Sequence, residues 1–168
     1  MGQNNHGVSL AEVLLVTAIL IILAGIALPT LSLTVDDAKV TAVEQELMRV
    51  RTGIDYYKFQ HLELLPGLDP NNGNWTTDAF NKQLTWATTQ YGEWASPGSS
   101  GYPFGPYLLE GIPNNPFNDL DDVIVVPAGA SASGYPNDNS GWVYFADDGT
   151  FRANTQATTS DGGRIYDL

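Results

Sequence analysis

The chain begins with a short polar segment, residues 1–7, which is followed by a long apolar one. Val8 to Leu28 is a 21-residue span whose one charged side chain is Glu12. As a helix this span is about 31 Å long, enough to cross the hydrocarbon core of a bilayer. Gly25 and Pro29 mark the places where such a helix would kink or unwind. An acid inside an apolar span of this length is costly, so Glu12 is a candidate functional residue.

Beyond this apolar half, residues 8–29, the pattern becomes that of an amphipathic helix over residues 30–65. The pattern ends near Leu65, where Pro66 supplies a stop signal. Most charged residues of this half fall away from a single apolar stripe. The stripe has alternating spacings of four and three and consists of Val43, Leu47, Val50, Ile54 and Tyr57. The sequence therefore predicts one long helix whose second half packs against a head through one face.

The head is expected to comprise residues 66–168. A short helix is predicted for residues 78–88, with Thr76 or Thr77 as its N-cap. The β-branched and aromatic runs predict strands at 123–126, 142–146 and 150–154, with a closing strand at 165–166. Asp147-Asp148-Gly149 is expected to join the middle two as a hairpin with a tight turn. The predicted fold class is α+β, a long N-terminal helix packed against a small antiparallel sheet.

Charge and composition exclude several functions. The chain has 19 acids against seven Lys and Arg, a net charge of −12, and this disfavours nucleic acid as a partner. The absence of cysteine excludes disulfides, thiol catalysis and cysteine metal sites. The two histidines, His6 and His61, belong to no catalytic or zinc motif, and no nucleophile elbow or phosphate-binding loop is present. We therefore expect a protein that is not an enzyme.

The beginning of the chain resembles the class III signal of type IV pilins and type II secretion pseudopilins. A short polar leader ends in Gly7, the apolar helix has Glu12 at its fifth position, and Pro29 follows. The resemblance continues in the head, where three segments are similar to the tails of pseudopilin-like proteins: residues 107–118, 141–144 and 152–155. The absence of cysteine is closer to the major pseudopilins than to pilins with a C-terminal disulfide.

The resemblance implies a processed and polymerised subunit. A prepilin peptidase would cut after Gly7 and methylate Val8, and the Glu12 carboxylate would pair with the new amino group of a neighbouring subunit. The implied partners are further copies of the chain, the peptidase and methylase, the assembly platform of a pilus or secretion machine, and minor pilins. The precursor would lie in the bacterial inner membrane, and the product would be a periplasmic or cell-surface filament.

The resemblance also implies a calcium hypothesis, because major pseudopilins hold Ca²⁺ in their C-terminal loops. The loop before the first predicted strand concentrates oxygen ligands: Asn118, Asp119, Asp121 and Asp122. Ca²⁺ takes six to eight oxygen ligands. The loop lacks the spacing of an EF-hand, and solvated acids in turns are common. No other cofactor is expected.

Other interpretations of the apolar span stay open. It has features of a secretory signal cut after Ala27, and of a simple membrane anchor. The corresponding alternatives are a secreted enzyme and a membrane-anchored acidic binding or receptor module that does not polymerise. Within the filament family, the sequence separates neither pilus from pseudopilus nor adhesion, motility, DNA uptake and secretion.

Overall fold

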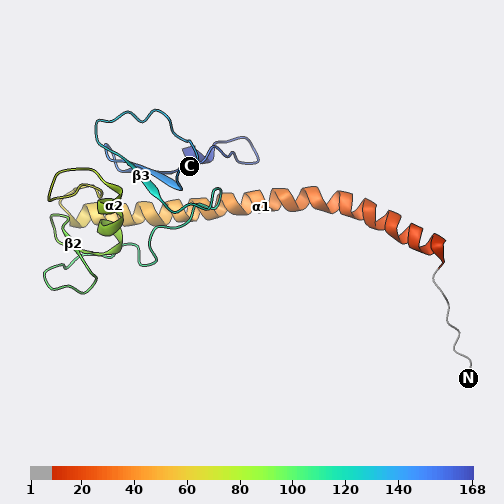
Figure 1. Ribbon diagram of the computed structural model, residues 1–168, viewed down its shortest axis with the longest axis horizontal. Coiled ribbons are helices and arrows are strands. Elements are labelled where there is room, and N and C mark those ends of the chain that lie inside the picture. The colour runs from red at the N-terminus through yellow and green to blue at the C-terminus, as the bar shows by residue number, and fades with distance from the viewer. Residues whose placement is uncertain (1–8) are drawn as a thin grey trace, which may run out of the picture. The chain divides into compact units, whose positions relative to one another are not determined.

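The computed structural model describes residues 9–168, apart from the side chains of residues 26–35. The chain divides into two units, residues 1–38 and 39–168. The described part of the first unit is the beginning of helix α1 (Leu10–Gln60), which is assigned as helix through both Gly25 and Pro29 (Figure 1). The second unit is the head, which includes the rest of α1.

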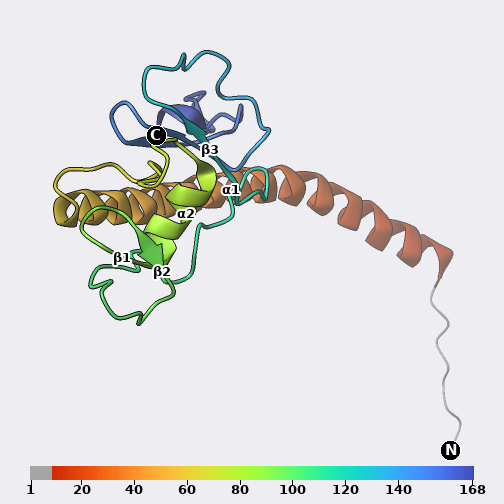
Figure 2. The same cartoon turned by 60° about the vertical axis from the view of Figure 1, so that its left-hand side comes forward.

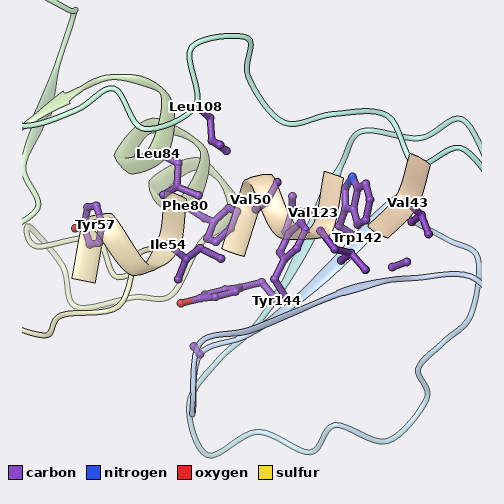
Figure 3. Close-up of a cluster of buried hydrophobic side chains, with 14 of the residues drawn as sticks. Val43, Val50, Ile54, Tyr57, Phe80, Leu84, Leu108, Val123, Trp142 and Tyr144 are labelled. Carbon is purple, nitrogen blue, oxygen red and sulfur yellow. The ribbon is translucent and has the colours of Figure 1, made fainter. Parts of the chain in front are cut away.

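The predicted apolar stripe on α1 is confirmed as the centre of the head's core. Its members, Val43, Leu47, Val50, Ile54 and Tyr57, are between 0% and 3% exposed. The second helix and the strands contribute to the same cluster of buried side chains, among them Phe80, Leu84, Trp142 and Tyr144. Figure 3 shows these side chains gathered along α1. The head is therefore built around one face of this helix.

α1 ends at Gln60, so its predicted end near Leu65 was wrong. Leu62 and Glu63 adopt φ angles of 57° and 64°, in the left-handed region that a right-handed helix cannot include. The backbone N–H and the ring Nδ1 of His61 both bond to the carbonyl of Tyr57, at 3.0 Å and 2.7 Å. The helix therefore ends before the chain reaches Pro66.

Helix α2 (Thr77–Thr85) starts where the sequence predicts. The Thr76 hydroxyl accepts a hydrogen bond from the backbone N–H of Ala79 at 3.1 Å, which makes Thr76 the N-cap. The predicted end at Thr88 was wrong. Residues Ala87–Thr88 form strand β1, which pairs antiparallel with β2 (Trp94–Ala95). The pairing of β1 with a neighbouring strand takes these residues out of the helix.

The main sheet has the strand order β3-β4-β5, with β3 at Val123–Val126, β4 at Trp142–Phe145 and β5 at Thr150–Ala153. The β4–β5 pair is the predicted antiparallel hairpin. In contrast, β3 runs parallel to β4, so this sheet is mixed rather than purely antiparallel. The chain between β3 and β4, residues 127–141, crosses over to allow the parallel pairing. The α+β fold class is confirmed, with a small antiparallel sheet and a mixed sheet (Figure 2).

Two smaller expectations need correction. The β4–β5 loop comprises residues 146–149, and only Gly149 in it has a positive φ, of 82°, so the connection is longer than a two-residue turn. Ile165–Asp167 forms a 3-10 helix, η1, instead of a closing strand. Ile165 is fully buried, and its backbone N–H bonds to the carbonyl of Ala157 at 3.1 Å.

The stripe gives a stability prediction with a neighbouring control. Leu47→Ala should lower the free energy of unfolding by about 2–5 kcal/mol, because it removes a buried side chain and leaves a cavity. Met48→Ala should change it by less than about 0.5 kcal/mol, because Met48 is 70% exposed. Denaturant unfolding of the two variants in the same detergent micelles measures the difference. Equal losses would contradict a core centred on this stripe.

Candidate assembly surface

The beginning of α1 exposes apolar side chains around its whole circumference. Ten of them are between 48% and 78% exposed in the chain by itself: Leu10, Val13, Leu14, Leu15, Val16, Ile19, Leu20, Ile21, Ile22 and Leu23. Runs of consecutive apolar residues point in all directions, since each residue turns the helix by 100°. A helix that is apolar all round is normally buried in protein or in lipid. This surface therefore needs a partner or a bilayer to cover it.

Within the part of the chain that the structure describes, no helix is sufficiently long and apolar to cross a membrane. Of the predicted processing and assembly residues, Gly7 and Val8 lie outside the described residues, as does the side chain of Pro29. Gly25 is described, and a Cβ added to it would meet nothing within 4 Å.

Glu12 lies in the first turn of α1 and is bonded to the residue that caps the helix. The backbone N–H of Ser9 donates to Glu12 Oε2 at 2.8 Å, and the backbone N–H of Glu12 donates to Ser9 Oγ at 3.2 Å. This reciprocal arrangement is a capping box, which satisfies two backbone donors at a helix start. The positive end of the helix dipole favours a carboxylate at this position.

The capping box was visible in the sequence and was missed there. Ser9-Leu10-Ala11-Glu12 has the S-x-x-E spacing of the motif, directly before an apolar run. The sequence interpretation treated Glu12 only as an acid inside an apolar span. The structure gives its carboxylate a partner within the same chain, so the acid also has a local role in starting the helix.

The four proposed calcium ligands lie in the loop before β3, and most of them bond to the chain itself. The amide of Asn118 donates to the carbonyl of Ser140 at 2.9 Å. Asp122 Oδ1 accepts the backbone N–H of Gly141 at 3.1 Å, and Asp119 Oδ1 accepts the amide of Asn114 at 3.1 Å. Within the described residues, no group of three or more His, Cys, Asp or Glu is placed to hold a metal ion. As placed, these side chains do not form a prepared calcium shell, and calcium binding stays a prediction.

Comparison with known proteins identifies the family. No protein-family model matches the chain, and no solved structure matches it. A curated relative does match: the type II secretion system core protein G of Pseudomonas aeruginosa is 31% identical over 136 residues. The matched region covers 71% of this chain and 94% of the relative. The chain belongs to the type II secretion pseudopilins.

Membership among the pseudopilins confirms the resemblance seen at the start of the chain. The relative is named as a core protein of a secretion system, which is not the name of an enzyme. The roles of Gly7, Val8, Glu12, Gly25 and Pro29 stay predictions for this pseudopilin. Of these residues, Glu12 has the most informative environment in the structure, because its carboxylate already accepts a hydrogen bond from Ser9.

The calcium hypothesis predicts a melting temperature that is higher in excess Ca²⁺ than in chelator, because a ligand that binds only the folded state stabilises it. Asp121→Asn combined with Asp122→Asn should abolish the difference. Excess Mg²⁺ serves as the control for ionic strength. Equal melting temperatures of the unmodified pseudopilin in Ca²⁺ and in chelator would contradict calcium binding by this loop.

Proposed function

We propose that this chain is a structural subunit of a type II secretion pseudopilus. The precursor is stored in the inner membrane, cut after Gly7, methylated at Val8 and polymerised with its N-terminal helix in the filament core. The observation that carries the proposal is the exposed apolar surface of α1 over residues 10–23, interrupted only by Glu12 and Thr17, in a chain that belongs to the pseudopilins. Packing against neighbouring helices in a filament would cover this surface after it leaves the lipid.

Glu12 is proposed to set the register between neighbouring subunits. A carboxylate has about four lone-pair sites, so accepting the N–H of Ser9 leaves capacity for the ammonium group of a neighbour. In apolar surroundings an unpaired charge is costly, so a register that brings the ammonium to the carboxylate is favoured over others. Because the ammonium group arises only when the leader is removed, cleavage and correct assembly are linked.

Replacing Glu12 tests this role. Glu12→Val should leave the protein inserted in the membrane and processed, but should lower the filament yield by about tenfold or more, because the charge pair that favours one register is lost. Glu93→Val is the matched control, because it removes an exposed carboxylate of the head. The measurement is the amount of filament sheared from cells that express each variant at equal levels. A normal yield for Glu12→Val would refute the assembly role.

The mature N-terminus distinguishes the proposed function from its rivals. Mass spectrometry should find a chain that begins with methylated Val8. An intact Met1 would instead support a membrane-anchored acidic binding module that does not polymerise. A chain that starts at Leu28 would indicate a secretory signal and a secreted protein. Electron microscopy of the sheared material then shows whether the processed chain forms filaments.

A further inference from the structure

His61, the residue that directly follows α1, is completely buried within a cluster of aromatic rings. Its ring stacks on that of Tyr57 with centroids 3.8 Å apart and planes within 8°. The rings of Phe104 and Tyr107 approach it at 5.4 Å and 6.0 Å. A buried histidine needs partners for both ring nitrogens, because an unsatisfied polar atom in such a place is costly.

Both ring nitrogens have hydrogen-bond partners. Nδ1 lies 2.7 Å from the carbonyl oxygen of Tyr57, which only accepts, so Nδ1 carries the proton. Nε2 lies 2.9 Å from Thr88 Oγ1, and in the neutral ring it accepts the hydroxyl proton. Protonation of Nε2 would turn this acceptor into a donor, so the bond that Thr88 donates to the ring would be lost and its hydroxyl proton would turn to another acceptor, such as the Tyr107 side chain.

The contact with Thr88 joins the end of α1 to the segment that contains β1 and β2. The backbone N–H of Thr88 bonds to the carbonyl of Phe104 at 2.8 Å, and the reverse bond is 3.2 Å long. A second contact joins the same segment to α1, because the hydroxyl of Tyr107 donates to Gln60 Oε1 at 2.6 Å. Residues 87–108 therefore attach to the end of the helix at two neighbouring points.

The described groups that face the ring offer no negative charge to balance a cation. From α1 and its last turn they are Tyr57 and, further out, the exposed Lys58–Glu63 ion pair at 3.5 Å. From β1 the group is Thr88, and from the following segment it is Tyr107. Burial raises the pKa of Tyr107 to about 12 and also raises the pKa of Tyr57, so both are neutral near pH 7.

Opposing effects act on the protonation of His61. Burial lowers the pKa of His61, while hydrogen bonds to the backbone of Tyr57 and Thr89 act in the other direction. The negative end of the helix dipole also favours a cation here. Burial has the largest effect, and the pKa lies below its ordinary value.

We propose that His61 is an acid-sensitive joint, in which protonation of the buried ring releases residues 87–108 from the end of α1. The unfolded or opened chain binds the proton more readily than the closed one, so the joint is fully stable above the ordinary histidine pKa of about 6.5. Its stability is lost as the pH falls below that value. The proposal concerns the head alone and does not depend on polymerisation.

Hydrogen exchange of the full chain in detergent micelles, between pH 7 and pH 5, tests the joint. The ordinary pKa values of Asp and Glu lie below this pH range, so the carboxylates stay largely ionised across it. The protection factors of the Thr88 and Phe104 amides should fall below pH 6.5. The fall should be at most about tenfold per pH unit, because the opened state binds one more proton than the closed state. The amides of Trp142 and Gly149 in the β4–β5 region should change much less.

Two substitutions separate His61 from the other histidine. His61→Gln, which has a donor and an acceptor but does not titrate, should abolish the pH dependence of protection at Thr88 and Phe104. In the uncleaved precursor, His6→Gln is the matched control and should leave the dependence unchanged. A pH dependence that survives in His61→Gln would overturn the proposal.

Direct titration of the His61 ring by NMR keeps the test informative if His61→Gln does not fold. In the unmodified chain this ring should titrate below the ordinary histidine pKa of about 6.5, and its protonation should coincide with the loss of protection at Thr88. A His61 ring that titrates at or above that value would overturn the proposal. So would a ring that becomes protonated while residues 87–108 stay protected.

Discussion

The head depends on the packing of its other elements against the buried stripe of α1. Strands β1 and β2 have two residues each, and β3, β4 and β5 have four each. An isolated two-stranded sheet is at best marginally stable in water, and a three-stranded one needs a packed hydrophobic face. The strands acquire a core because Trp142 and Tyr144 from β4 and Phe80 from α2 pack into the cluster that the stripe forms. The second half of α1 is therefore part of the head's core, and a mutation there acts on α2, β3, β4, β5 and η1, which share the cluster.

A head with so little regular structure must satisfy many backbone groups by other means, and asparagine side chains supply several of the bonds. The Asn115 amide donates to the carbonyl of Gly141 at 2.7 Å, and the Asn118 amide donates to that of Ser140 at 2.9 Å. A Cβ on Gly141 would collide with the carbonyl of Leu120, so the two loops approach each other backbone to backbone. The side chain of Asn118 therefore stabilises the fold in this structure, because it bonds to the backbone of the neighbouring loop.

The elements with a clear period were predictable from the sequence, and those defined by long-range pairing were not. The stripe from Val43 to Tyr57 follows from helical spacing alone, and the cap at Thr76 follows from local chemistry. The parallel pairing of β3 with β4 depends on how residues 127–141 cross the sheet, which no local pattern encodes. The end of α1 was misplaced because Leu62, a residue that rarely adopts a positive φ, does so here.

The residues of the candidate site were predicted from the sequence, whereas its local bonding, which the S-x-x-E spacing of residues 9–12 indicates, was missed. Glu12 stands out in the sequence because it is an acid in an apolar span, and the structure adds that Ser9 already satisfies part of its hydrogen-bonding capacity. This bond lowers the cost of keeping the carboxylate in apolar surroundings before a neighbour arrives. The free energy gained from pairing with a neighbour's ammonium is therefore smaller than it would be for a carboxylate with no other hydrogen bond. Under the proposed function, a modest gain of this kind suits a contact that must select one register while the exposed apolar surface of α1 supplies most of the attraction.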